Sequence, residues 1–153
     1  MTASTRDLVE AFYEAYTRRD SAAMAPYLAD DVDWTVSGPV DVLPFCGHHR
    51  GKQAVLDLVD RGIPAVFKIF AIVLDRMLVE GECASTLHRV SANTPDGRVI
   101  SYRVVHFFQF KDGKLVENLT LIDSFDAVEQ VLGYSLSVHD APALAEGDEL
   151  VAV

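Results

Sequence analysis

The second half of the chain consists of long runs rich in β-branched and aromatic residues, separated by short turn sequences. The turn sequences are Glu80-Gly81, Pro95-Asp96-Gly97 and Asp112-Gly113, which are typical of hairpins. Consecutive hairpins predict an antiparallel meander rather than a parallel sheet with helical crossovers. The predicted strands cover 66–78, 83–93, 99–111 and 115–122.

The first half carries helical periodicity instead. Residues 8, 9, 12, 15 and 16 are apolar and recur at helical spacing, and a second short helix follows Asp20-Ser21. Residues 32–36 alternate as a strand, 37–49 read as a loop, and a third helix is expected from Gly51 until Gly62 and Pro64 stop it. A last helix is predicted over 125–133. The fold class is therefore α+β, with a curved antiparallel sheet whose concave face is covered by helices and encloses a cavity for a ligand.

Length and composition limit the possible functions. The 153 residues fit one domain over 1–133 with a tail over 134–153. The formal net charge of −10 argues against a nucleic-acid partner. No apolar run reaches the ~20 residues of a membrane span, and no signal peptide is visible. Cys46 and Cys83 lie far apart and are expected to be free thiols, so the protein is predicted to be cytoplasmic.

Motifs for a metal or a nucleotide are weak. His48-His49 is the one candidate metal pair, but adjacent side chains rarely point the same way and no Cys or carboxylate cluster accompanies it. No glycine-rich phosphate loop follows a strand. We therefore expect neither a metal nor a cofactor.

Four segments resemble the nuclear transport factor 2-like (NTF2-like) superfamily: FYEAYTRRD at 12–20, LADDVDW at 28–34, HRGK at 49–52 and FQFKDGKLV at 108–116. The resemblance covers residues 5–133. It implies a cystatin-like, cone-shaped antiparallel sheet wrapped around N-terminal helices. The superfamily includes ketosteroid isomerases, scytalone dehydratase, limonene epoxide hydrolase and SnoaL-like polyketide cyclases, so the resemblance defines the fold more sharply than the function.

The ketosteroid isomerase pattern is not preserved. The resemblance places Val36 at the position of the catalytic base, Phe12 at the oxyanion tyrosine and His106 at the oxyanion aspartate. The SnoaL-like branch fits better, because its final strand tends to end in an Asp followed by a short helix, as at Asp123 and 124–133. By this resemblance, Asp123 corresponds to the acid/base position of the polyketide cyclases.

His106 and Asp123 are the catalytic candidates. His106 shares a strand face with Tyr102, Val104 and Phe108, and its ordinary pKa of ~6.5 suits proton transfer. The alternative is a core histidine with satisfied hydrogen bonds. Asp123 is either a cavity acid/base or the N-cap of the following helix.

The predicted ligand-binding residues come from several elements. Trp34 either walls the cavity or fills the core, and Tyr16 could direct its hydroxyl inward while Tyr13 is expected to face outward. Arg89 inside the cavity would indicate either an anionic ligand group or an ion pair with a carboxylate of the chain. His88, on the opposite strand face, is expected to meet solvent or a subunit partner. The full set is Phe12, Tyr16, Trp34, Val36, Val59, Leu87, Arg89, Asn118 and Thr120.

The sequence thus favours a SnoaL-like, cofactor-independent acid/base enzyme: an isomerase, cyclase or dehydratase acting on a hydrophobic, oxygenated small molecule. The alternatives are a non-catalytic ligand-binding module and a dimeric association module. Val105 and Phe107 lie on the strand face opposite Val104 and Phe108. Burial of both faces predicts a homodimer through the convex face of the sheet.

Overall fold

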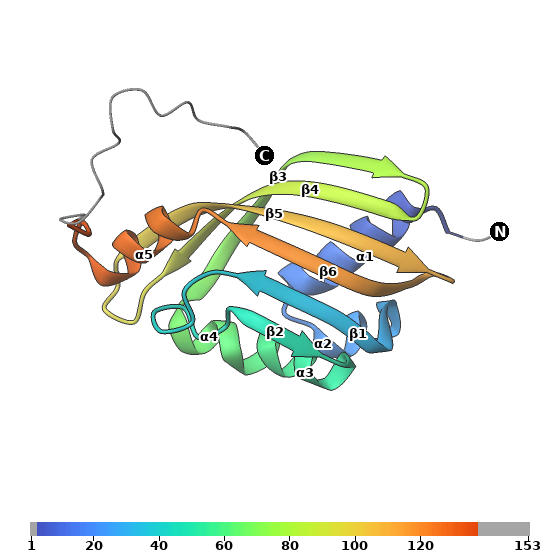
Figure 1. Ribbon diagram of the computed structural model, residues 1–153, viewed down its shortest axis with the longest axis horizontal. Coiled ribbons are helices and arrows are strands. Elements are labelled where there is room, and N and C mark those ends of the chain that lie inside the picture. The colour runs from blue at the N-terminus through green and yellow to red at the C-terminus, as the bar shows by residue number, and fades with distance from the viewer. Residues whose placement is uncertain (1–2, 138–153) are drawn as a thin grey trace, which may run out of the picture.

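A computed structural model describes residues 3–137 as one curved, six-stranded sheet with helices on its concave side (Figure 1). The strand order is β2-β1-β6-β5-β4-β3. The strands are β1 Leu28–Ser37, β2 Gly47–Arg50, β3 Lys68–Glu80, β4 Cys83–Asn93, β5 Val99–Lys111 and β6 Lys114–Ile122. The helices are α1 Thr5–Thr17, α2 Ser21–Met24, α3 Lys52–Asp57, α4 Ile63–Val66 and α5 Ser124–Leu132, with a 3-10 turn at Ala25–Tyr27 and a π-helix at Leu58–Gly62.

Strands β3 to β6 form the predicted antiparallel meander. The β5–β6 turn has positive φ at Asp112 (50°) and Gly113 (74°), which matches the right-handed twist of the two strands. The register places Val90 opposite Tyr102 and His106 opposite Thr120. These pairings fix which side chains share the concave face.

The sheet continues beyond the meander on its β6 edge. Strand β1 pairs with β6 in parallel, with Trp34 opposite Asn118, and β2 pairs antiparallel with β1. The segment 37–49 was expected to be a loop, but strand β2 begins within it at Gly47 and continues to Arg50. It was missed because its polar sequence, GHHR, has no apolar alternation.

Helix α1 packs on the concave face and lies behind the sheet in Figure 1. The Ser4 hydroxyl accepts from the Asp7 backbone N–H, and the Asp7 carboxylate accepts from the Ser4 N–H, which completes a capping box. The buried face of the helix carries Val9, Phe12, Tyr13 and Ala15. Phe12 connects the helix to the sheet, with its ring 6.1 Å from that of Trp34 on β1 and 6.0 Å from that of Phe108 on β5.

The third predicted helix runs further than expected. It continues from Lys52 to Val66 as α3, the π-helix and α4, and passes through Gly62 and Pro64. The π-helix closes with the Ile63 N–H donating to the Leu58 carbonyl. Pro64 then falls in the first turn of α4, where a missing N–H costs little.

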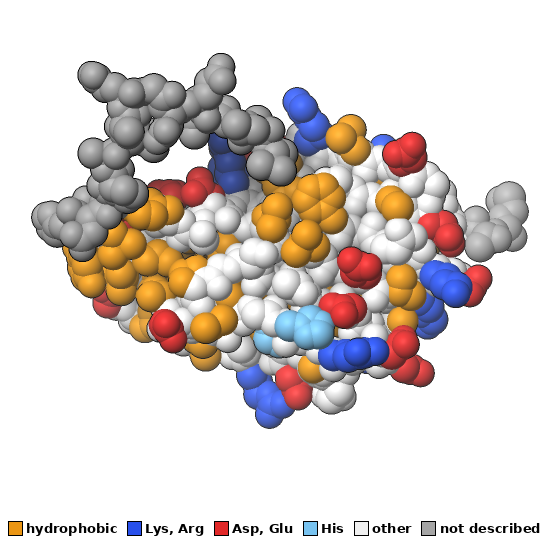
Figure 2. Space-filling model, in the orientation of Figure 1, with side chains coloured by type: hydrophobic (Ala, Val, Ile, Leu, Met, Phe, Trp, Pro, Cys, Tyr) orange, Lys and Arg blue, Asp and Glu red, His pale blue; other side chains and the backbone are white. Residues whose placement is uncertain are grey.

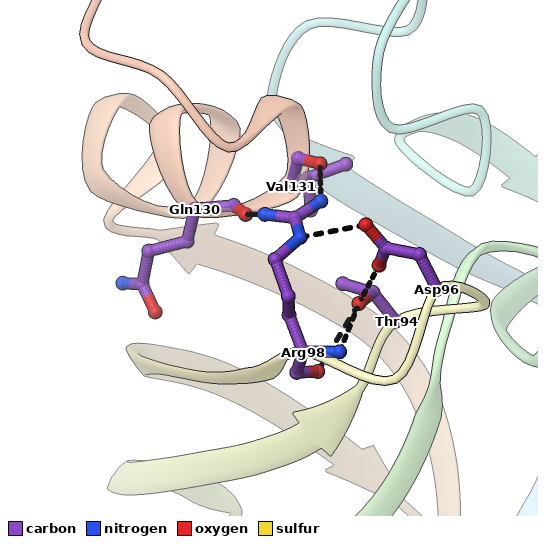
Figure 3. A network of polar contacts seen from close by, with 5 residues as sticks. All are labelled: Thr94, Asp96, Arg98, Gln130 and Val131. Atoms are coloured by element: carbon purple, nitrogen blue, oxygen red, sulfur yellow. Dashed lines mark hydrogen bonds and ion pairs between the residues drawn. The ribbon is translucent and has the colours of Figure 1, made fainter.

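Helix α5 is held against the β4–β5 hairpin by Arg98 (Figure 3). The Arg98 guanidinium donates to the carbonyl oxygens of Gln130 at 2.5 Å and Val131 at 2.8 Å, near the end of the helix, and to Asp96 at 2.8 Å. The Gln130 amide bonds both the N–H and the C=O of Ser101, each at 2.8 Å. Strand β6 stops pairing with β5 at Val104, so the Gln130 side chain satisfies the backbone groups of Ser101 that no β6 residue reaches.

No helix within residues 3–137 is long and apolar enough to cross a membrane. Most of the predicted tail, residues 138–153, lies outside the described residues.

Candidate functional site: a histidine-lined cavity in the concave face

A small cavity lies between the concave face of the sheet, α1 and the π-helix. Its volume is about 50 Å³, and its wall is mainly apolar, with Trp34, Val36, Val59 and Val104 among its residues. Ligand sites usually exceed roughly 300 Å³. Any ligand larger than a few atoms must therefore displace side chains when it enters.

His106 lies on the cavity wall and is held by two polar side chains of β6. Its Nδ1 is 3.3 Å from Asn118 Oδ1 and 3.0 Å from Thr120 Oγ1, while Asn118 Nδ2 donates to Thr120 Oγ1 at 2.8 Å. The imidazole stacks on Phe108, with ring centroids 5.3 Å apart. The ring is thus fixed on three sides, and Nε2 makes no hydrogen bond within residues 3–137.

His88 also lies in the cavity, which corrects the expectation that it faces solvent or a partner. It is 2% exposed, and its ring is 4.3 Å from that of Tyr13 and 5.9 Å from that of His106. Its Nδ1 is buried without a hydrogen-bond partner among residues 3–137. Buried polar atoms in folded proteins are rarely left unpaired. This nitrogen is therefore available to a ligand.

Both imidazoles are neutral at pH 7. Burial, the largest cause, and the neighbouring His88 together lower the pKa of His106 to about 3, while the hydrogen bond to Asn118 opposes the shift. Burial lowers the pKa of His88 to about 4, against the opposing negative charge of Asp75. Each ring can therefore accept a proton or a hydrogen bond.

Tyr13 points inward, contrary to the expectation that it faces outward. It is buried, and its hydroxyl is 2.8 Å from Thr86 Oγ1. Burial raises the pKa of its hydroxyl well above the ordinary value. Tyr13 therefore remains protonated at the edge of the histidine pair.

Most of the predicted ligand-binding residues lie in or behind the cavity wall. Trp34, whose indole N–H is buried without a partner, lines the cavity together with Tyr16, Val36, Val59 and Thr120. Phe12 and Asn118 are buried just behind this wall, Phe12 against Trp34 and Asn118 against His106. The wall thus has an apolar body with a few polar atoms.

Three predicted site residues lie outside the cavity. Arg89 is exposed on the convex face, where it pairs with Asp75 at 3.0 Å, and Leu87 lies on the same face opposite Val105. Asp123 is exposed at the start of α5 and borders a separate surface depression. The expected convergence of His106 and Asp123 on one cavity is therefore absent.

The side-chain parity of β4 explains the misplacement of His88 and Arg89. Ala84, Thr86, His88 and Val90 share the buried face of β4, and two of them are polar, so the alternation of apolar and polar residues did not identify that face. The register of the β4–β5 hairpin would have identified the correct face of His88. The Pro95–Gly97 turn pairs Val90 with Tyr102 and His88 with Val104, which places His88 on the face of His106.

No cluster of three or more His, Cys, Asp or Glu side chains within the described part of the chain could hold a metal ion.

A curved sheet closed over helices around such a cavity defines the chain as NTF2-like, and the comparisons with known proteins agree. The model of the SnoaL-like domain matches residues 9–118, and the chain belongs to this family. No curated protein matches the chain significantly.

Solved structures share the whole architecture. A protein from Rhodopseudomonas palustris named "Putative Isomerase" is 31% identical, with a TM-score of 0.75 over 87% of this chain and 99% of that one. An NTF2-like protein of unknown function from Burkholderia pseudomallei is 23% identical, with a TM-score of 0.75 over 85% and 98%. An LEH-like epoxide hydrolase from M. tuberculosis is 19% identical, with a TM-score of 0.66 over 82% and 87%. The last two show the fold alone.

Proposed function

We propose that this chain binds a small hydrophobic, oxygenated molecule in the concave cavity and moves a proton on it with His106, without a cofactor. The observation that carries the proposal is the fixed, neutral imidazole of His106 beside two buried polar atoms that have no partner, Trp34 Nε1 and His88 Nδ1. Asp123 has no part in the proposal, because it lies outside the cavity.

The hydrogen bonds of Asn118 define the tautomer of His106. Asn118 Nδ2 donates to Thr120, so the carbonyl oxygen Oδ1 is the atom that faces His106 Nδ1. A carbonyl oxygen only accepts, so Nδ1 carries the proton and Nε2 keeps its lone pair. A base oriented by a second polar group is the arrangement that general base catalysis requires.

The low pKa of His106 is compatible with this role. Removal of a proton from the substrate would create an imidazolium and an oxyanion in the same apolar cavity. Their mutual attraction is strong at low dielectric and offsets the desolvation that holds the empty-site pKa at about 3. The N–H of Trp34 is available as a donor to the substrate oxygen.

Proton transfer next to a carbonyl supports isomerisation, aldol-type cyclisation or dehydration. The 31% identical protein named as an isomerase supports this class of reaction. The π-helix at Leu58–Gly62 supplies Leu58 and Val59 to the wall, and such irregular turns occur often at functional sites. We propose that this segment moves to admit the ligand.

The test uses 2-tetralone, a neutral ketone with exchangeable α-protons. Binding is followed by the fluorescence of Trp34, the one tryptophan of the chain, and proton transfer by deuterium uptake into the ketone in D₂O. His106→Gln should lower the exchange rate by about 10²–10⁴ and leave binding within a few-fold. His48→Gln is the matched control, because His48 is exposed on β2.

Full exchange activity in His106→Gln would exclude His106 as the base. Binding without any exchange in the wild-type protein would favour the alternative of a non-catalytic ligand-binding module.

We also propose that the convex face of the sheet forms a homodimer. Phe107 is 46% exposed there, Leu78 64% and Leu121 42%, and Figure 2 shows hydrophobic side chains gathered over the middle of this face. Such a patch is unusual on a monomer. Sedimentation should give a dimer that Phe107→Arg converts to a monomer, and a wild-type monomer at high concentration would contradict the proposal.

A further inference from the structure

Arg19 is held in an unusual conformation just after α1. Its backbone φ is +56°, in the left-handed region that non-glycine residues rarely adopt, and its N–H donates to the Tyr16 carbonyl at 3.0 Å. That conformation costs roughly 1–2 kcal/mol. It brings the guanidinium carbon to 5.5 Å from the centroid of the Tyr16 ring, which lines the cavity.

The guanidinium of Arg19 lacks an anionic partner. Its Nη1 is buried and makes no hydrogen bond, and Arg19 forms no ion pair within residues 3–137. The adjacent Arg18 differs in each respect, because it is exposed and pairs with Glu14 at 3.0 Å. The side chain as a whole is half-buried, but burial of one charged donor without an acceptor is costly, so Nη1 is expected to meet an acceptor that residues 3–137 do not supply.

Two tyrosine hydroxyls belong to the same end of the cavity. Tyr16 and Tyr102 both line it, and neither hydroxyl makes a hydrogen bond within the described residues. Burial raises the pKa of each hydroxyl, and the positive charge of Arg19 partly opposes both shifts. Tyr16 and Tyr102 thus place two donors on the cavity wall, and Arg19, which lies behind Tyr16 rather than on the wall itself, adds a positive charge beside them.

This end lies apart from the histidines. Arg19 lies beyond the C-terminal end of α1, whereas Tyr13, which contacts His88, lies about one turn before Tyr16 within the helix. Tyr102 precedes His106 by four residues on β5, which corresponds to roughly 13 Å. A ligand that spans the cavity would therefore meet the donors at one end and the imidazoles at the other.

We infer that Arg19, Tyr16 and Tyr102 bind an anionic oxygen of the ligand, so that the substrate class is an apolar acid whose carboxylate lies at the end of the cavity away from His106. This inference rests on the proposed function of the cavity and adds the charge of the substrate and the residue that selects it. Arg19 is a specificity residue in this scheme, while proton transfer remains with His106.

The experiment compares 2-naphthoate with 2-naphthamide, two ligands of nearly equal shape that differ in charge. Dissociation constants are measured by Trp34 fluorescence at pH 7.5. The wild-type protein should bind the naphthoate at least about tenfold more tightly, because hydrogen bonds to a charged group are the stronger kind. Arg19→Gln should abolish this preference and leave naphthamide binding within a few-fold, and Arg18→Gln should retain the preference.

Each outcome separates the two proposals. Naphthamide binding with no preference for naphthoate, or a preference that persists in Arg19→Gln, would overturn the role of Arg19 and leave the cavity function standing. Equal weakening of both probes in Arg19→Gln would show a structural role and also overturn it. Binding of neither probe to the wild-type protein would overturn the role of Arg19, and the 2-tetralone experiment would then decide whether the cavity function stands.

A conservative variant guards against a folding defect. Arg19→Lys keeps the positive charge without the planar fork, so it should retain part of the preference for naphthoate. If Arg19→Gln does not fold by circular dichroism, the inference depends on this variant. If Arg19→Lys keeps the full preference for naphthoate and binds naphthamide as the wild-type protein does, recognition by charge is still supported. Complete loss of the preference for naphthoate in Arg19→Lys would contradict the inference.

Discussion

The concave and convex faces of the sheet differ both in the volume of their hollows and in the side chains that line them. On β5, Tyr102, Val104 and His106 face the concave cavity, whereas Arg103, Val105 and Phe107 face the convex side. The concave cavity measures about 50 Å³, while an open groove beside Phe107 and Leu78 on the convex side measures about 690 Å³. The larger hollow is the shallower one.

Under the proposed function, a choice made on volume alone would place the chemistry on the wrong face of the sheet. The concave cavity holds two imidazoles with depressed pKa values and buried donors that lack partners. The convex groove is broad and bordered by exposed apolar side chains, which suits a flat protein surface. These differences support our proposals of ligand chemistry at the concave face and association at the convex face.

The largest contrast should come from two phenylalanines. Phe12 is 2% exposed at the centre of the concave packing, whereas Phe107 is 46% exposed. Phe12→Ala should lower the free energy of unfolding by about 3–5 kcal/mol, and Phe107→Ala should change it by about 0.5 kcal/mol or less in the dilute monomer. Urea denaturation at low protein concentration measures both, and similar losses would contradict the assignment of the core.

The next effect is a pH dependence that arises from the concave face. The folded pKa values of His88 and His106 lie at about 4 and about 3, below the ordinary value of 6.5. The unfolded chain therefore binds more protons between these values and pH 6.5. Stability is fully present above pH 6.5 and falls as the pH is lowered, by about 2 kcal/mol for the pair between pH 6.5 and 5.5.

Urea denaturation at several pH values tests this slope. Besides each other, the two histidines have Tyr13 as a titratable neighbour, and His88 also feels the negative charge of Asp75. His106→Asn should remove about half of the slope, and Phe12→Leu is the control that lowers stability equally at each pH. A slope that does not change in His106→Asn would show that other groups control the acid sensitivity.

The smallest contrast compares polar contacts on the two faces. Tyr13→Phe removes a buried hydrogen bond to Thr86 and should cost about 1 kcal/mol. Arg89→Gln removes an ion pair with Asp75 whose arginine side chain is 58% exposed, so screening by water should reduce its effect to about 0.5 kcal/mol or less. Thermal unfolding of the two variants measures the difference, and a larger loss in Arg89→Gln would reverse the order.

The sequence predicted the parts of the fold that depend on local patterns. The strand runs and their turns gave the meander, the spacing of apolar residues gave α1, and Gly133, with φ +81°, ends α5 as expected. Strand β2 and the helix through Pro64 were missed. Strand β2 depends on its pairing with β1, and the helix through Pro64 depends on the π-helix before it, and neither feature is visible in the local sequence pattern.

The site was predicted in part for the same physical reason. His106, Trp34 and Thr120 lie where the strand parity placed them. On β4 the buried face carries Thr86 and His88, so polarity no longer marks the solvent side and the prediction chose the wrong face. Asp123 begins α5 rather than ending in the cavity, because β6 stops pairing at Ile122.

The most direct test of the account is where a ligand binds. Imidazole ¹⁵N spectra of the labelled protein would be recorded during a titration with 2-tetralone. Binding in the concave cavity predicts that the signals of His88 and His106 shift together and saturate, while that of His48 on β2 stays unchanged. A saturable shift of His48 alone, or fluorescence-detected binding with no change at His88 and His106, would contradict the assignment of ligand chemistry to the concave face.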